Sequence, residues 1–95
     1  MQNLVLEILK KEKPYLEQQF GVTEIGLFGS FARGDNMPNS DIDIIVKVQK
    51  ISFVNIMGIL NYLETIFNKK VDLVIHGKNI SKRFLNFIQK ELMYA

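Results

Sequence analysis

The chain has 95 residues but no cysteine, one histidine and two prolines. The lack of cysteine excludes disulfide bonds, thiolate metal sites and a cysteine nucleophile, and it is typical of a reducing compartment. Neither sign of charge is in large excess, because 12 basic and 10 acidic residues leave a formal net charge of +2. Since there is no block of like charge either, the composition gives no reason to expect direct binding of nucleic acid.

Long hydrophobic runs are also absent. No run approaches the length that spans a bilayer, and Glu7 interrupts the N-terminal sequence too early for the apolar core of a signal peptide. These absences predict a cytoplasmic protein with no membrane partner. The length and a hydrophobic content of 47% are typical of one small domain with a modest core. We expect this single domain to span residues 1–95.

The apolar pattern predicts elements in the order helix, strand, short helix, strand, helix, strand, helix. They are expected at residues 4–20, 23–29, 31–33, 41–48, 53–67, 71–75 and 82–92. Ser30, Ser52 and Ser81 stand in the N-cap positions of helices, and Gly21 follows the first helix as a C-cap. Pro14 either kinks the first helix or starts a new turn. This order predicts a small α/β (α+β) domain with a mixed sheet of three or more strands and helices packed on it.

The last two long helices carry apolar residues at helical spacing. We interpret both stripes as core packing rather than as a cofactor site. The first stripe consists of Phe53, Ile56, Met57, Leu60, Leu63 and Phe67, and the second of Phe84, Leu85, Ile88 and Leu92.

Two carboxylates, Asp41 and Asp43, lie two residues apart in the predicted strand 41–48. Side chains at this spacing share one face of a strand, about 7 Å apart at Cα, while Ile42 and Ile44 face the core. Carboxylate oxygens are ligands that Mg²⁺ prefers, together with oxygens of substrate phosphates. For this pair taken alone, the wet face of a half-buried strand is the favoured interpretation.

Asp72 adds a third carboxylate in the predicted strand 71–75. An acid within an otherwise apolar strand is unfavourable unless it is paired or bound to a metal. If Asp72 lies beside Asp43, three carboxylates can bridge two Mg²⁺ ions, which lie about 3.5–4 Å apart in two-metal enzymes. The alternative is a buried Asp72 paired with Lys69 or Arg33.

The connections between the strands allow the three acids to meet. The link between strands 23–29 and 41–48 is short, as an antiparallel pairing permits. The link from strand 41–48 to strand 71–75 contains a full helix, as a parallel crossover requires. We therefore expect Asp41 and Asp72 to lie near the turn that ends the first strand.

Gly29 and Ser30 form that turn. Gly29 permits close approach of the backbone, free N–H groups at the start of the next helix point at an anion, and the Ser30 hydroxyl can bind phosphate. Arg33 shares a helical face with Ser30 and can either clamp a phosphate or pair with Asp35 or another acid. Taken singly, these residues are more often structural, so the functional hypothesis rests on their conjunction with the three acids.

Three further polar residues are assigned no catalytic role. His76, the only histidine, is expected at the surface near a strand end. Tyr94 is expected to pack, and Ser40 is expected to cap the loop before Asp41, where it can also support that acid.

Three segments together resemble the motifs of the DNA polymerase beta-type nucleotidyltransferase superfamily. They are Gly29-Ser30-Phe31-Ala32-Arg33-Gly34, Ser40-Asp41-Ile42-Asp43 and Val71-Asp72-Leu73-Val74. More narrowly, nearly the whole chain resembles the minimal nucleotidyltransferases, or MNT proteins. The resemblance implies the polymerase-beta-type fold, with Asp41, Asp43 and Asp72 as catalytic Mg²⁺ ligands. It also implies Asp72 as a candidate general base and Gly29 and Ser30 as the triphosphate-binding pair.

Members of that family often act with a HEPN-domain protein, an RNase-like toxin. The MNT protein is then an antitoxin that transfers AMP from ATP to a tyrosine of the toxin. The resemblance therefore implies ATP as substrate, Mg²⁺ as cofactor and a HEPN-domain toxin as partner. Larger relatives carry extra segments for small or nucleic-acid acceptors, and their lack here favours a protein acceptor.

Two alternatives stay open at this point. A non-catalytic antitoxin would neutralise its partner by binding alone. Nucleotidyl transfer to a small molecule such as an aminoglycoside is less favoured, because a second copy of the chain would have to supply the acceptor site. The sequence leaves open whether the chain assembles with itself or with another chain.

Overall fold

The computed structural model describes residues 3–95 and contains four helices and four strands within that range. The helices are α1 (Leu4–Phe20), α2 (Ser30–Arg33), α3 (Phe53–Phe67) and α4 (Lys82–Ile88), and the strands are β1 (Val22–Phe28), β2 (Ile42–Val48), β3 (Val71–Ile75) and β4 (Met93–Tyr94). The predicted order of elements is confirmed, and β4 is an addition that the sequence pattern did not indicate. None of the described helices is long and apolar enough to cross a membrane.

The strands form one mixed sheet in the order β3-β2-β1-β4. β1 pairs antiparallel with β2 and with β4, whereas β2 pairs in parallel with β3. The chain crosses from β2 to β3 through α3, as a parallel pair requires. The mixed α/β class and both strand pairings expected from the sequence are confirmed.

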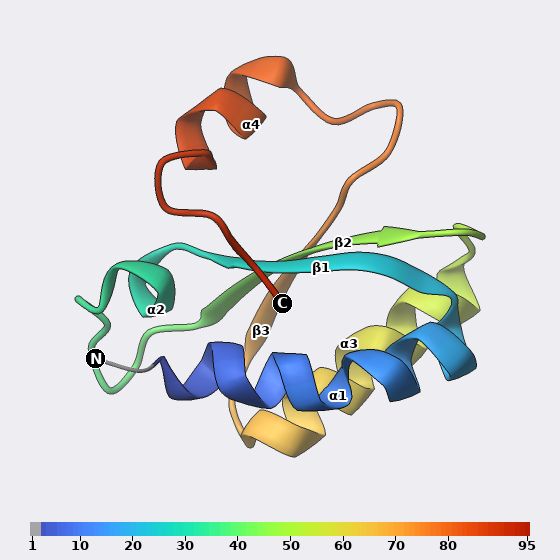
Figure 1. The fold of residues 1–95 in the computed structure, drawn as a ribbon, viewed down its shortest axis with the longest axis horizontal. Helices are drawn as coiled ribbons and strands as arrows, with labels where there is room; N and C mark the ends of the chain where they lie inside the picture. The colour runs from blue at the N-terminus through green and yellow to red at the C-terminus, as the bar shows by residue number, and fades with distance from the viewer. Residues whose placement is uncertain (1–2) are drawn as a thin grey trace.

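The helices divide unequally between the two faces of this sheet (Figure 1). α1 and α3 cover one face, over a large core that includes Ile44 and Leu63, both with 0% exposure. α4 crosses the other face, where Ile45 and Ile88 belong to a smaller apolar cluster. Side chains alternate along β2, so Asp43 lies on the same face as Ile45, which is the face of α4.

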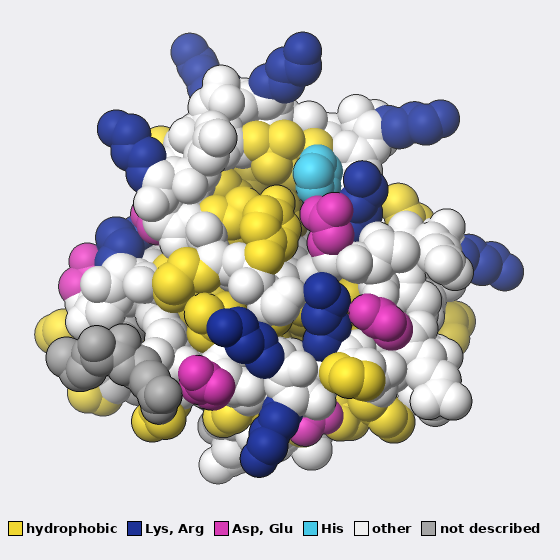
Figure 2. Space-filling view, in the orientation of Figure 1, with side chains coloured by type: hydrophobic (Ala, Val, Ile, Leu, Met, Phe, Trp, Pro, Cys, Tyr) yellow, Lys and Arg dark blue, Asp and Glu magenta, His cyan; other side chains and the backbone are white. Residues whose placement is uncertain are grey.

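The face that carries α4 is only partly covered. A groove of ≈ 500 Å³ runs beside α4 and is lined mainly by apolar side chains. Four of these are Ile51, Val74, Ile80 and Phe84. Figure 2 shows hydrophobic side chains reaching the surface between α4 and the sheet. The short α4 therefore leaves room on this face for a ligand.

Local sequence signals set most helix ends. The hydroxyls of Ser52 and Ser81 accept hydrogen bonds from backbone N–H groups three residues on, at 3.1 and 3.3 Å, which confirms both as N-caps. Gly21 follows α1 in the left-handed conformation, so that C-cap is confirmed too. α1 continues through Pro14, and the alternative of a new turn there is wrong.

Two element ends differ from the prediction. β1 ends at Phe28, and Gly29 rather than Ser30 is the N-cap of α2, because Gly29 leaves the extended conformation with a φ of 76°. The Ser30 hydroxyl is therefore free of a capping role. α4 ends at Ile88 rather than at Leu92, because the chain has to turn back to pair β4 with β1.

Phe53 is also misplaced by the sequence pattern, which put it on the buried face of α3. Its side chain is 80% exposed. The fully buried residues of α3 are Ile59 and Leu63, and Phe53 lies about 100° around the helix from their midpoint at 3.6 residues per turn. The buried stripe is narrower than the run of apolar residues suggests.

Candidate active site

All six residues that the sequence singled out line one cleft of ≈ 440 Å³. They come from the β1–α2 turn and α2, from the start of β2 and the residue before it, and from the start of β3. They are Gly29, Ser30, Arg33, Asp41, Asp43 and Asp72. Ser40 lines the same cleft, and α4 and the residues after it contribute Phe84, Phe87, Ile88 and Glu91. The sheet and α4 thus form the two walls of the cleft.

Strand register places Asp43 between the other parts of the site. β2 pairs Asp43 with Phe28 at the end of β1 and, on the other side, with Asp72 of β3. Asp41 directly precedes β2 and shares a face with Asp43 by alternation. The structure therefore brings the three carboxylates into one cleft, beside the turn that follows β1.

The surroundings of Asp72 decide between its two interpretations. Asp72 is exposed, so the alternative of a buried acid paired with Lys69 or Arg33 is wrong. Lys69 instead donates from Nζ to a backbone carbonyl in the loop before β2 at 2.8 Å, and Arg33 has other acidic partners. The carboxylate of Asp72 is accessible to a ligand in the cleft.

The three acids repel one another. Burial of the Asp43 carboxyl group raises its pKa above the ordinary value of 3.8, and the negative charges of Asp72 and then Asp41 raise this pKa further. A divalent cation placed among the ionised groups would relieve the repulsion. A carboxyl pKa raised in this way, in a cleft, is typical of a functional site.

The donor set suits Mg²⁺ but does not enclose it. Within residues 3–95, no three Asp, Glu, His or Cys side chains are arranged to hold an ion by themselves. Mg²⁺ is commonly held by one or two carboxylates, with water and substrate phosphates completing its shell. Asp41 and Asp43 offer those carboxylates, with Asp72 next to Asp43 in register. The residues therefore fit Mg²⁺ that binds together with a nucleotide.

Gly29 connects the carboxylates to the turn. Its φ of 76° and ψ of −157° are a conformation that residues with a side chain rarely adopt. A Cβ at this position would lie 2.8 Å from Cγ of Asp43 and closer still to its Oδ2. Only glycine therefore lets the turn approach the Asp43 carboxylate, so a phosphate on the turn and a cation on Asp43 would be neighbours.

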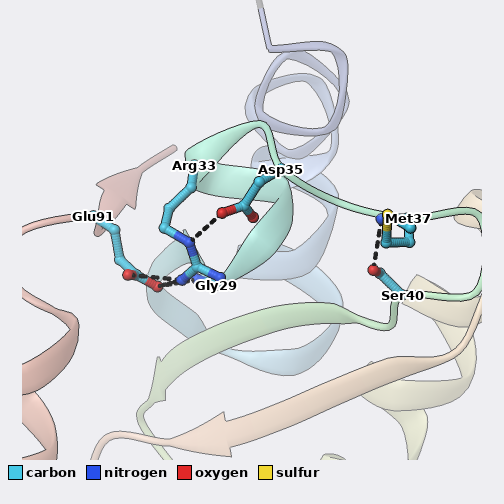
Figure 3. Close-up of polar contacts among 6 residues, drawn as sticks. All are labelled: Gly29, Arg33, Asp35, Met37, Ser40 and Glu91. Atoms are coloured by element: carbon cyan, nitrogen blue, oxygen red, sulfur yellow. Dashed lines mark hydrogen bonds and ion pairs between the residues drawn. The ribbon is translucent and has the colours of Figure 1, made fainter.

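Arg33 extends from α2 along the same cleft (Figure 3). Its Nε donates to Asp35 at 3.0 Å, and its Nη1 donates to Glu91 at 2.9 Å. These hydrogen bonds, first that to Asp35 and then that to Glu91, raise the guanidinium pKa. Of the two roles predicted for Arg33, the structure contains the ion pair, and the phosphate clamp stays a prediction.

The sequence as a whole matches the family model described as "Polymerase beta, Nucleotidyltransferase" over residues 10–94. The chain belongs to this family. The nucleotidyltransferase class expected from the three motifs is confirmed. The mixed sheet is thus that of a polymerase beta nucleotidyltransferase.

Individual relatives of this nucleotidyltransferase have more specific names than the family. It is 38% identical over 98 residues to the candidate protein adenylyltransferase MJ1379 of Methanocaldococcus jannaschii, covering 96% of this chain and 94% of that one. It is 35% identical over 89 residues to the protein adenylyltransferase MntA of Thermococcus cleftensis, covering 93% and 89%. The fold also matches a structure of a tri-AMPylated Shewanella oneidensis HEPN toxin in complex with MNT antitoxin, with a TM-score of 0.65, 18% identity, and coverage of 94% of this chain and 70% of that one.

Sequence reasoning missed the α4 side of this nucleotidyltransferase site. Phe84, Phe87 and Glu91 line the cleft, although none lies in a recognisable motif. Glu91 accepts a hydrogen bond from the backbone N–H of Gly29, 62 residues earlier in the chain. The one available signal in the sequence was that Phe87 is aromatic but stands outside the predicted apolar stripe of its helix. In the structure its side chain is 76% exposed.

The three minor predictions have simple outcomes. His76 does not line the cleft, and its backbone N–H donates to the carbonyl of Val46. The Ser40 hydroxyl accepts from the N–H of Met37 at 2.8 Å, so Ser40 closes the loop as predicted (Figure 3). Tyr94 pairs with Gly26 across β4 and β1, with its side chain over that glycine.

Proposed function

We propose that this nucleotidyltransferase is a Mg²⁺-dependent protein adenylyltransferase. It transfers AMP from ATP to a tyrosine hydroxyl of a HEPN-domain toxin in the cytoplasm and thereby acts as the antitoxin. One observation carries the proposal, namely the single cleft in which the Gly29 turn touches the carboxylate cluster. The name of the Thermococcus relative supports a protein acceptor, and the tri-AMPylated Shewanella toxin supports AMP as the transferred group.

The residues of the cleft divide the work between phosphate binding and metal binding. The Gly29 backbone N–H, the Ser30 hydroxyl and the Arg33 guanidinium hold the terminal phosphates of ATP. Asp41 and Asp43 hold Mg²⁺, in one or two ions. When bound, Mg²⁺ neutralises charge on the triphosphate and lowers the pKa of the attacking hydroxyl.

The transfer is a displacement at the α-phosphorus. The tyrosine oxygen forms a bond to that phosphorus while the bond to the bridging oxygen breaks, and pyrophosphate leaves with that oxygen. The proton of the tyrosine hydroxyl passes to the Asp72 carboxylate, which is exposed at the cleft. The exposed ring of Phe87 stands at the rim, where an approaching protein would contact it.

Transfer of label from α-³²P-ATP to the co-expressed HEPN partner tests this function. The wild-type chain with Mg²⁺ should label the partner, and the double variant Asp41→Asn/Asp43→Asn should not, because it lacks the metal ligands. Asp35→Asn is the matched control, since it removes one acidic charge near Arg33 but leaves the three carboxylates intact. It should retain labelling.

Labelling that persists in the double variant would overturn the proposed mechanism. If no chain labels the partner and the double variant still neutralises the toxin at equal dose, the antitoxin acts by binding alone. If label reaches only a small molecule, the acceptor class is wrong while the carboxylate chemistry stands.

A further inference from the structure

Glu91 occupies the part of the cleft proposed for the terminal phosphates. Its Oε2 accepts a hydrogen bond from the Gly29 backbone N–H. Its Oε1 and Oε2 also accept from Nη1 of Arg33, at 2.9 and 3.0 Å (Figure 3). One carboxylate thus takes up both the backbone donor and the guanidinium donor that a phosphate would use.

A carboxylate and a phosphate compete for such donors. Both present oxyanion oxygens to N–H groups, and each donor serves one strong acceptor at a time. The Glu91 side chain is only 16% exposed, so it lies within the cleft rather than at its rim. A phosphate seated on the Gly29 N–H must therefore displace Glu91, and a triphosphate beside an undisplaced Glu91 would meet its negative charge.

The position of Glu91 in the chain allows this displacement. Glu91 follows α4 and precedes β4, and its backbone N–H donates to the carbonyl of Ile88 in a turn. The contacts to Gly29 and Arg33 are made by the end of a side chain with three rotatable bonds. Rotation of the side chain vacates the subsite without moving the buried Ile88 anchor of α4.

We propose that Glu91 is a built-in occupant of the terminal-phosphate subsite and lowers the affinity of the cleft for ligands that place a phosphate on the Gly29 N–H. The inference rests on the proposed function for the identity of that subsite. It makes Glu91 an affinity-determining residue that discriminates by phosphate number. Triphosphate and pyrophosphate groups have to displace Glu91, whereas AMP does not reach its donors.

Calorimetric titration of the full chain with inorganic tripolyphosphate and Mg²⁺ measures the competition without any transfer reaction. In Glu91→Gln the shape is kept and the charge is lost, and Kd should fall by about tenfold because the competing occupant binds the donors more weakly. Asp35→Asn is the matched control, because Asp35 holds the same Arg33 without touching Gly29. It should change Kd by no more than about twofold. AMP with Mg²⁺ is the control ligand, and its Kd should stay the same in both variants.

Each other outcome overturns the inference in a distinct way. An unchanged or raised Kd for tripolyphosphate in Glu91→Gln would mean that Glu91 supports the turn instead of competing with phosphate. An equal effect in Asp35→Asn, or an equal gain for AMP, would reduce the result to net charge. If wild-type and Glu91→Gln chains both fail to bind tripolyphosphate, the phosphate subsite itself is wrong. If the wild-type chain transfers AMP but Glu91→Gln binds tripolyphosphate with the wild-type Kd, the role of Glu91 is wrong and the proposed function stands.

The amide signal of Gly29 gives a second readout. In the wild-type chain this N–H donates to a charged carboxylate, so its ¹H resonance should lie downfield and move upfield in Glu91→Gln. Tripolyphosphate with Mg²⁺ should then shift it in both chains, at lower ligand concentration in the variant. If neither the substitution nor the ligand changes the ¹H chemical shift of the Gly29 amide, the assignment of the subsite is contradicted.

Discussion

The two faces of the sheet treat their polar groups in opposite ways. On the face covered by α1 and α3, Glu12 accepts a hydrogen bond from the Tyr62 hydroxyl, and this bond raises the Tyr62 pKa to about 12. On the face of α4, the carboxyl pKa of Asp43 is raised by burial and by like charges instead. On the first side, an acid of α1 is thus paired with a neutral donor of α3, whereas the second side gathers acids that repel one another.

The two faces of the sheet also differ in how completely their side chains are buried. The larger core lies on the side of α1 and α3, and the fully buried residues of both helices belong to it. α4 contributes one fully buried residue, Ile88, and leaves Phe87 exposed beside the cleft. One face therefore supplies most of the stability, and the other uses incomplete packing to hold a site open. Substitutions matched across the two faces test this division.

The largest expected effect on stability comes from the face that α1 and α3 cover. Leu63 is 0% exposed, and Leu63→Ala should lower the free energy of unfolding by about 2–5 kcal/mol, because it removes transfer energy and leaves a cavity. Phe87→Ala removes a larger side chain that is 76% exposed, and should change it by less than about 0.5 kcal/mol. Urea unfolding followed by circular dichroism measures both. Similar losses for the two variants would contradict the division between the faces.

A smaller difference is expected between two glycines at the ends of α2. Both Gly29 and Gly34 have positive φ, at 76° and 86°, so alanine is strained at either position. A Cβ at Gly34 would meet nothing within 4 Å, whereas one at Gly29 would overlap the Asp43 carboxylate. Gly29→Ala should therefore cost about 1–3 kcal/mol more than Gly34→Ala in the free energy of unfolding.

Transfer activity separates the same two variants. Gly29→Ala should abolish labelling of the partner, because the turn and the carboxylate can no longer approach each other. Gly34→Ala, in the same short helix, should retain it. Equal stability of the two variants, with equal activity, would show that the close approach of Gly29 to Asp43 has no importance.

The fold and half of the site were predictable because their signals are local or periodic. The two-residue spacing of Asp41 and Asp43 fixes a shared face, and the helix before residue 71 predicts that strand 71–75 runs parallel to strand 41–48. The register that sets Asp72 beside Asp43 comes from the structure. The other half depends on where α4 lies over the sheet. The contact between Glu91 and Gly29 joins residues 62 positions apart, and no local pattern encodes a single side-chain contact at that separation. The prediction that Phe53 is buried was wrong for a related reason, since apolar residues at a helix end do not reveal how far the buried stripe extends.

The smallest predicted effect is a gain in stability from removing a site residue. The Asp43 carboxyl has a pKa above its unfolded value, so the folded state binds the proton more tightly than the unfolded state does. Its contribution to stability is therefore present below the ordinary aspartate pKa of 3.8 and is lost as the pH rises through the folded pKa. In EDTA at pH 7, Asp43→Asn should melt slightly above wild-type, and the difference should vanish near pH 3.

Mg²⁺ with a nucleotide should reverse that order, because a bound cation stabilises the ionised carboxylate cluster and the variant lacks a ligand for it. Thermal melts of both chains in EDTA and in Mg²⁺ with a non-hydrolysable ATP analogue measure the exchange. Glu24→Gln, an exposed acid on β1 outside the cleft, is the control for loss of one charge and should follow wild-type in both conditions. If Asp43→Asn melts below wild-type in EDTA, the Asp43 carboxylate stabilises the fold. That result would contradict the division between a stabilising face and a face that holds the site.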